Sequence, residues 1–230
     1  SDTGNKYRFD DFGTSAVTLE ISEGGTFTFD QSDSSNNGHP LRFATQADAA
    51  NSSQYTTGVT TNGTPGQAGA YTRITVAASA PTLFYYCTNH SGMGGQANTP
   101  VTNSFSNFAG SIQSNISPNT TSGFSIVKWV NGTSSAQTIG HGLGVKPSII
   151  ILKTLTAVQD WRVYTSTLGA THFLKLNETD AGATASSIWN NTEPTTSVFT
   201  TGTGSQMINN TLVAYCFNDV QGFSKMGSYT

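Results

Sequence analysis

The sequence predicts an all-β protein with an N-terminal Greek-key sandwich and a C-terminal β-sandwich or jelly roll. Two observations carry this prediction. Short segments that alternate apolar and polar residues recur about every 8 to 12 positions, with Gly, Asn, Ser and Pro between them. No segment repeats its apolar residues with the helical period of about 3.6 residues, so we expect no helix longer than two turns.

The length and local composition predict two domains. With 230 residues, the chain is long enough for two domains of about a hundred residues each. Large apolar residues are scarce between residues 94 and 122, where Gly, Ser, Asn and Pro are frequent, and this is typical of a boundary. We therefore expect a domain at residues 1–105, a linker at 106–122 and a second domain at 123–230.

The first domain begins with strand-like alternation. Val17–Ile21 and Thr26–Phe29 alternate apolar and polar residues around a Gly-Gly turn, so we expect two sandwich strands with their apolar side chains inward. A polar loop of Ser, Asp and Asn then leads to His39, and an aromatic strand at 82–86 ends at Cys87. Residues 94–100 alternate poorly and meet a proline.

The second domain shows stronger strand signals. The run Ile149–Leu152 is continuously apolar, which predicts a strand buried on both faces. We expect strands at 124–130, 137–139, 148–153, 160–164, 171–176, 187–189, 197–200 and 211–217.

The composition points to an extracellular or particle-bound protein. Only 10% of the residues are charged and the net charge is −3, while Gly, Ser, Thr and Asn are abundant; the charged share of an average domain is about 25%. No Lys/Arg cluster offers a footprint for nucleic acid or an anionic membrane, and no apolar run approaches the roughly 18 residues of a membrane span. We expect a virion or extracellular localisation, without a nucleic-acid partner or membrane insertion.

A candidate metal site follows the aromatic strand. Cys87, His90 and Met93 place a thiolate, an imidazole and a thioether within seven residues, and these donors with a second His form the blue-copper ligand set. The other His of the first half is His39. The alternative interpretation is structural, with Cys87 as a small buried apolar residue, Met93 as a core filler and His39 as a turn residue.

The first half resembles the cupredoxins, the group of plastocyanin, amicyanin and azurin, over roughly residues 15 to 95. The resemblance lies in the Asn-rich loop before His39 and in the run Phe84-Tyr85-Tyr86-Cys87-Thr88-Asn89-His90-Ser91-Gly92-Met93. The two-residue gap between the last His and the Met is most similar to amicyanin.

The cupredoxin resemblance implies a complete ligand set for type 1 copper. It implies His39 and His90 as imidazole ligands, Cys87 as the equatorial thiolate and Met93 as the weak axial ligand. It also implies that Asn37 ties the two ligand loops together. The usual function of such a copper site is electron transfer, and the resemblance implies that electrons would enter and leave through the edge of His90.

The second half resembles a domain of tail-fibre and other virion structural proteins from marine bacteriophages and cyanophages. The resemblance spans most of residues 123–230 and rests on Gly123–Val127, Gln137–Pro147, Val213–Phe217 and Gly222–Thr230. It implies a structural role without assigned chemistry. Because that family usually continues past this point, we interpret the second domain as short or truncated at its C-terminus.

Several other residues could carry chemistry, but a structural interpretation is favoured for each. His141 lies between glycines and is expected in a tight turn. Asp160, Trp161 and His172 could line a glycan site, although a core position is favoured for the Trp. Cys216 is expected to be an inert buried thiol. We find no paired carboxylate or Ser-His-Asp arrangement, so the sequence does not predict an enzyme.

The sequence thus favours a virion-associated or extracellular structural protein in which copper stabilises the first domain. Other fibre subunits, including copies of this chain, are the expected partners. One alternative is a soluble copper protein that performs outer-sphere electron transfer. A second alternative is a carbohydrate-binding adhesin that recognises a host-surface glycan.

Overall fold

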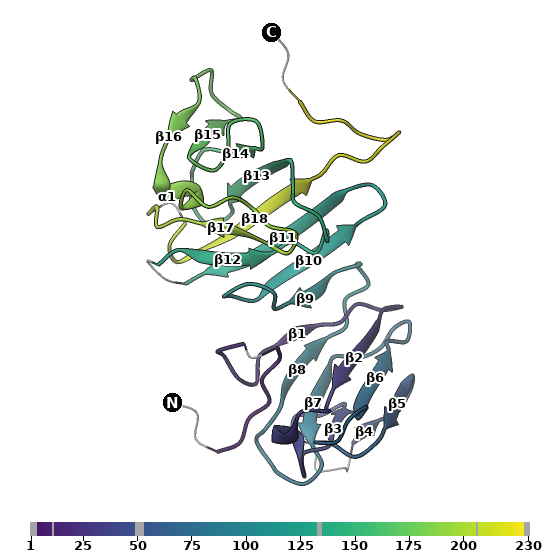
Figure 1. Ribbon diagram of the computed structural model, residues 1–230. Helices are drawn as coiled ribbons and strands as arrows, with labels where there is room; N and C mark the ends of the chain where they lie inside the picture. The colour runs from purple at the N-terminus through teal and green to yellow at the C-terminus, as the bar shows by residue number, and fades with distance from the viewer. Residues whose placement is uncertain (1–3, 11, 49–52, 133–134, 206, 228–230) are drawn as a thin grey trace. The chain divides into compact units, whose positions relative to one another are not determined.

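The computed structural model describes residues 4–10, 12–48, 53–132, 135–205 and 207–227 (Figure 1). The chain divides into two compact units, Ser1–Phe105 and Ser106–Thr230. Within the described ranges, the helical segments are the four-residue helix α1 (Ser186–Trp189) and the 3₁₀ turn η1 (Ser34–Asn36). The prediction of an all-β fold is therefore confirmed. No helix in the described part of the chain is long and apolar enough to cross a membrane.

The first unit contains a five-stranded and a three-stranded sheet (Figure 1). The five-stranded sheet has the order β1 (Leu19–Glu20), β8 (Gly95–Asn98), β7 (Leu83–Cys87), β3 (Leu41–Ala44) and β4 (Gln54–Tyr55). The three-stranded sheet has the order β2 (Thr26–Asp30), β6 (Tyr71–Thr75) and β5 (Val59–Asn62). The pair β1–β8 is parallel and the other pairs are antiparallel. Strand β7, which ends at Cys87, thus lies in the middle of its sheet.

Contacts between the two sheets make the first unit a sandwich. The Thr72 hydroxyl of β6 donates to the carbonyl oxygen of Leu41 in β3, at 2.9 Å. The ring of Phe29 lies 5.5 Å from that of Phe43, again joining the two sheets. Phe43 and Ile74 are fully buried, and burial of such a side chain contributes about 1.5–3 kcal/mol. This packing holds β3 of the five-stranded sheet against β2 and β6 of the three-stranded sheet.

Strand β8 forms despite its poor alternation because glycine lets it approach β7 closely. Gly95 pairs with Tyr85. A Cβ atom at Gly94 would lie 1.7 Å from the carbonyl oxygen of Tyr85, so a larger residue would push the two strands apart. The chain that follows Met93 is therefore held against the strand that carries Cys87.

The second unit is a sandwich built on one large sheet (Figure 1). Its order is β16 (Ala183–Thr184), β15 (His172–Lys175), β14 (Arg162–Thr165), β13 (Ile149–Thr154), β18 (Asn210–Phe217), β11 (Phe124–Asn131), β10 (Ser114–Asn119) and β9 (Phe105–Asn107). A two-stranded sheet pairs β12 (Gln137–Gly140) with β17 (Val198–Thr201). Trp129 packs on Phe199 at 5.5 Å and Tyr164 on Trp189 at 6.0 Å. The small sheet and α1 therefore cover one face of the large sheet.

Three expectations for the second half were wrong in detail. The segment 106–122 is not a linker, because it contains β10, which pairs with β11 over six residues. Ser187–Trp189 is helical instead of extended, and the helix ends at Asn190 in the left-handed conformation, at φ 53°. The run Ile149–Leu152 is fully buried on one face only, since its first and third residues remain half-exposed.

The half-exposed residues belong to the outer face of the large sheet. Four aromatic side chains lie there, and we call them the outer aromatic face: Phe124, Trp161, Tyr215 and Phe217. The ring of Tyr215 lies 6.4 Å from those of Phe124 and Trp161, with interplanar angles of 5° and 23°. Each ring is only partly buried. The second unit therefore has one closed apolar face and one aromatic face that remains accessible.

Candidate metal centre

Strand pairing brings His39 and Cys87 together. Leu41, at the start of β3, pairs with Cys87 at the end of β7. The amide of Thr88 then donates to the carbonyl oxygen of Pro40, at 3.1 Å. Because the pairing continues to this point, His39 enters the sheet beside the end of β7. His39 and Cys87 thus lie next to each other in the fold, although they are 48 residues apart in the sequence.

The loop before β3 is built from local hydrogen bonds. The Asp33 carboxylate accepts from the amide of Ser35 at 2.8 Å and caps the turn η1. Gly38 has a φ of 76°, in the left-handed region, and the amide of His39 donates to the carbonyl oxygen of Asn36 at 2.8 Å. Glycine adopts this conformation without strain, so the loop reverses tightly and presents the imidazole.

Three ligand atoms converge at the end of β7. The Cys87 Sγ atom lies 3.8 Å from Nδ1 of His39 and 3.6 Å from Nδ1 of His90. The donor atoms of the three residues all lie within 4.8 Å of one another, and the two imidazole ring centroids are 4.6 Å apart. Cys87 is 2% exposed, His39 is half-buried and His90 is exposed. The cluster therefore has a buried sulfur and an accessible imidazole edge.

The sulfur–nitrogen distances fit a shared metal ion. Metal–sulfur bonds of about 2.3 Å and metal–nitrogen bonds of about 2.1 Å, at angles between about 109° and 120°, place the two donors about 3.6 to 3.8 Å apart. The two distances of 3.6 and 3.8 Å lie in this range. The three donor atoms also converge, within 4.8 Å of one another. The residues present thus fit a small-ion site.

The fourth predicted ligand lies in the same loop. Met93 is 4% exposed and follows Gly92, whose φ of 69° turns the chain inward. Its burial agrees equally with a core side chain and with an axial ligand. The role of Met93 at the metal therefore stays a prediction.

Two side chains fasten the loop that carries His90. Asn89 donates from Nδ2 to the carbonyl oxygen of Gly38, at 2.9 Å, and so joins the two ligand loops. The amide of Gly92 donates to the Asp48 carboxylate at 2.7 Å. The tie that we expected from Asn37 is thus made from the opposite loop by Asn89.

The environment of His39 favours its neutral form. Burial, and after it the neighbouring His90, lowers the pKa of His39. An imidazole with a lowered pKa is neutral at physiological pH, and only neutral imidazole binds a metal. The lowered pKa of His39 and the position of its Nδ1 atom beside the Cys87 sulfur therefore both suit a metal ligand.

Sequence reasoning missed two residues that support His39. The Gln31 side chain is 2% exposed, and its Nε2 donates to the carbonyl oxygen of His39 at 2.9 Å. Its Oε1 accepts from the amide of Leu41 at 3.1 Å. The Tyr7 hydroxyl donates to the same His39 carbonyl oxygen at 2.9 Å. A single polar residue after a strand and an aromatic residue far upstream carry no pattern that would reveal these contacts.

His141 and Cys216, the candidate residues of the second unit, both lie in its core. His141 is fully buried; its Nδ1 accepts from the amide of Leu143 at 3.2 Å and its Nε2 lies 3.3 Å from the carbonyl oxygen of Thr195. Cys216 is also fully buried, and burial raises the pKa of its thiol well above the usual range. Both residues therefore serve packing, as expected from the sequence.

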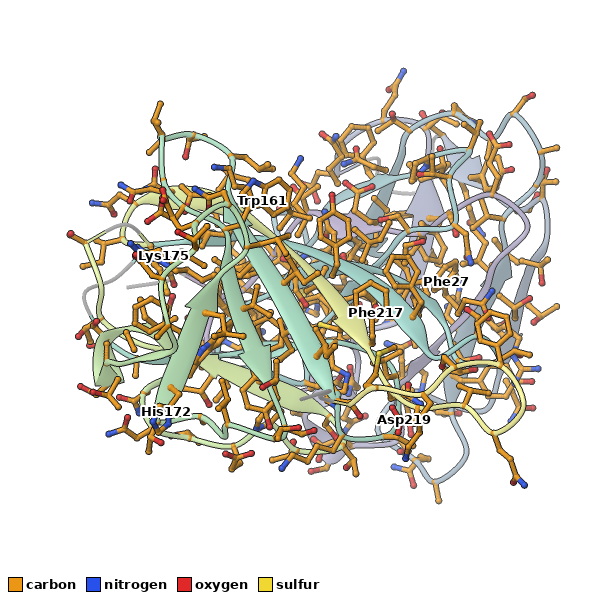
Figure 2. The ribbon with its side chains drawn as sticks, turned by 90° about the horizontal axis from the view of Figure 1, so that it is seen from above. Phe27, Trp161, His172, Lys175, Phe217 and Asp219 are labelled. Atoms are coloured by element: carbon orange, nitrogen blue, oxygen red, sulfur yellow. The ribbon has the colours of Figure 1, made fainter. Side chains whose placement is uncertain are left out.

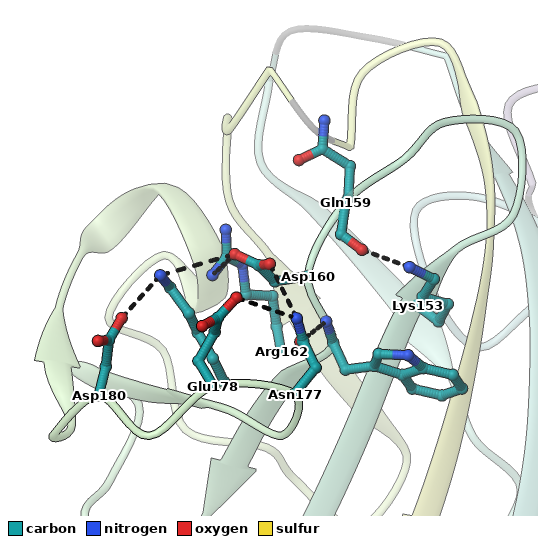
Figure 3. Close-up of polar contacts among 9 residues, drawn as sticks. Lys153, Gln159, Asp160, Arg162, Asn177, Glu178 and Asp180 are labelled. Atoms are coloured by element: carbon teal, nitrogen blue, oxygen red, sulfur yellow. Dashed lines mark hydrogen bonds and ion pairs between the residues drawn. The ribbon is translucent and has the colours of Figure 1, made fainter.

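Asp160 is engaged in a charge network (Figure 3). Its carboxylate lies 3.2 Å from Arg162 and 3.7 Å from Lys175, and it accepts from Asn177 at 3.1 Å. The hydrogen bond from Asn177 and then the two cationic charges outweigh partial burial and lower the pKa of Asp160. These partners occupy both carboxylate oxygens, which leaves little capacity for a ligand.

Trp161 and His172 do not line one site. Their strands pair with Val163 opposite Leu174, so the two residues lie at opposite ends of the strand pair, as Figure 2 shows. The expected core position of Trp161 was wrong, since its ring is half-exposed on the outer aromatic face. Trp161 therefore shares its surface with the outer aromatic face and not with His172.

The fold and the cluster define an all-β, two-unit protein with a Cys/His/His group at the end of a central strand. The chain belongs to the family described as a domain of unknown function, DUF7483, whose model matches residues 44–230. Searches of curated proteins and of solved structures found no match. The family match includes Cys87 and His90 and begins after His39.

Proposed function

We propose that the first unit binds one copper ion through His39, Cys87 and His90, with Met93 as the axial ligand. The observation that carries the proposal is the position of the Cys87 sulfur, 3.6 and 3.8 Å from two imidazole nitrogens. A thiolate with two imidazoles and a thioether is the donor set that favours copper over zinc. Copper bound in this set supplies one-electron chemistry with little change of geometry.

The protein groups prepare the site in three ways. Burial of Cys87 excludes water from the sulfur. The neutral imidazole of His39 requires no deprotonation before binding. His90 is exposed, so a partner molecule can reach the site within a few ångströms of its edge. These features support both a structural and an electron-transfer role for the metal.

For the whole chain we favour a structural role in a virion or an extracellular fibre. The low charge and the Gly, Ser, Thr and Asn content of the sequence support it, as does the resemblance of the second half to phage fibre domains. Metal binding to the folded state would stabilise the first unit directly. Copies of the same chain are the partners that such an assembly requires.

The experiment that tests the metal proposal is a Cu(II) titration of the whole chain, followed by visible absorption. We expect an intense thiolate-to-copper band in the wild type and its loss in Cys87→Ser. A wild-type protein without this band, or a variant that keeps it, contradicts the proposed ligation. Cycling the loaded protein with a redox partner then separates the two roles, because slow exchange favours the structural one.

The outer aromatic face supports a second candidate function, the binding of an acidic polysaccharide. Sugar rings stack on partly exposed aromatic rings. Two lysines lie on the same face, since Lys128 and Lys153 both pair with Val213, and Nζ of Lys153 lies 5.6 Å above the Trp161 ring. Their charge complements a glycan that carries carboxylate or sulfate groups.

Affinity electrophoresis in gels that contain a polyuronate or a neutral glucan tests this second candidate. We expect retardation in the polyuronate alone, weakened about tenfold by Trp161→Ala and lowered by salt. Equal mobility in both gels contradicts it. Trp161 is only half-buried, so its replacement should leave the fold intact.

A further inference from the structure

Tyr7 connects the N-terminal segment to the loop that carries Met93. Its side chain is 6% exposed, although the surrounding residues 5–8 form no regular secondary structure. Its amide donates to the carbonyl oxygen of Met93 at 3.0 Å, and its own carbonyl oxygen accepts from the amide of Ala16 at 2.9 Å. The side chain of Lys6 adds a bond to the carbonyl oxygen of Gly92. The segment is thus attached to the ligand loop at two successive residues.

The Tyr7 side chain reaches the other ligand loop. Its hydroxyl donates to the carbonyl oxygen of His39 at 2.9 Å, and Gln31 donates to the same oxygen. Both lone pairs of this carbonyl are therefore engaged by buried side chains, which fixes the peptide plane from which the His39 side chain projects. The ring packs at 6.3 Å from that of Tyr85.

We infer that Tyr7 is a positioning residue of the proposed copper centre, which fixes the main chain at His39 through its hydroxyl and at Met93 through its amide. The inference rests on the proposed function. One residue thus joins two ligand loops that are 54 residues apart in sequence. Since groups that orient ligands commonly alter metal affinity by about tenfold or more, loss of the hydroxyl should loosen the site while the fold remains.

The test compares Tyr7→Phe with Tyr85→Phe in the full chain. Tyr85 is a matched control, because it is equally buried and its hydroxyl also donates to a main-chain carbonyl, that of Val17, at 2.6 Å. We expect Tyr7→Phe to weaken Cu(II) binding about tenfold and to shift the thiolate-to-copper band. Tyr85→Phe should change neither, even where it lowers the unfolding temperature to the same extent. Equal effects of the two variants overturn the inference.

If the Tyr7→Phe variant fails to fold, a measurement on the wild-type protein still tests the inference. Because coupling is reciprocal, copper binding should slow hydrogen exchange of the Tyr7 amide by more than it slows that of Tyr85. An unchanged exchange rate at Tyr7 on copper binding overturns the inference.

Hydrogen exchange of the metal-free protein separates this inference from the metal proposal. If the wild type binds no copper, the proposed function fails; faster exchange of the His39 and Gly92 amides in Tyr7→Phe than in Tyr85→Phe then still supports the positioning role. If the wild type binds copper and these rates do not differ, only the inference fails.

Discussion

The two units contain the same pair of residue types and use them in opposite ways. In the first unit the cysteine ends β7, and its sulfur faces two imidazoles at 3.6 and 3.8 Å. In the second unit Cys216 lies inside β18 and His141 has both ring nitrogens next to main-chain partners. Donor atoms thus face one another where two loops meet at the end of β7, whereas Cys216 is enclosed within β18 and His141 by main-chain groups of Leu143 and Thr195.

The largest expected difference is between the histidines. His39→Gln or His90→Gln removes a proposed imidazole ligand and should weaken Cu(II) binding by more than about a hundredfold, beyond the usual effect of an outer-shell change. His141→Gln should leave copper binding unchanged, because its ring is enclosed in the other unit. Titration with absorption detection measures both. Loss of copper binding in His141→Gln would contradict the proposal that only the first unit binds the metal.

Metal removal should affect the units unequally. At a free copper concentration about a hundred times the dissociation constant, binding contributes about 2.7 kcal/mol to the folded state. A chelator should therefore accelerate amide exchange in β7 and leave β18 unchanged, which mass spectrometry of the exchanged protein can resolve. Equal acceleration in both strands would show that the metal stabilises the chain as a whole.

Cys216 offers a smaller test within the second unit. Cys216→Ser places a hydroxyl in an apolar position and should destabilise the unit by about 1–3 kcal/mol, measured by denaturant unfolding. Cys216→Ala should cost less, since it adds no polar group. Copper binding should remain normal in both variants. A change in the copper band in either one would contradict a purely structural role.

The smallest effect is expected from pH. Burial lowers the pKa of His141, against the opposing hydrogen bond to Thr195. The unfolded state then binds a proton more readily, so the second unit should lose about 1 kcal/mol of stability per pH unit below pH 6.5 and be unaffected by this group above it. Chemical denaturation between pH 5 and 8 measures the slope. His141→Asn should flatten it, and an unchanged slope in this variant contradicts the assignment of the pH dependence to His141.

The alternation of apolar and polar residues predicted most strands, because most strands bury the side chains of one face only. It failed at Ser187–Trp189, where three residues are too few to distinguish a strand from a helical turn and tertiary burial of Trp189 decides. It also failed for 106–122, where small polar residues form β10 by pairing with the strongly apolar β11. The composition of residues 106–122 alone does not indicate that this segment pairs with β11.

The candidate site was partly predictable. Cys87 and His90 lie three residues apart in one loop, so their proximity follows from the chain itself. His39 required the pairing of β3 with β7, and the structure brings all three together. Tyr7 and Gln31 could not be predicted, because their contacts with His39 depend on the folded path of the N-terminal segment and on a buried hydrogen bond.

The family match begins at Ala44, the last residue of β3. Leu41, which pairs with Cys87, and the proposed ligand His39 lie upstream of this point, as does Tyr7. A match to the family model therefore does not report whether a chain carries the histidine that faces Cys87 or the tyrosine that holds this histidine in place.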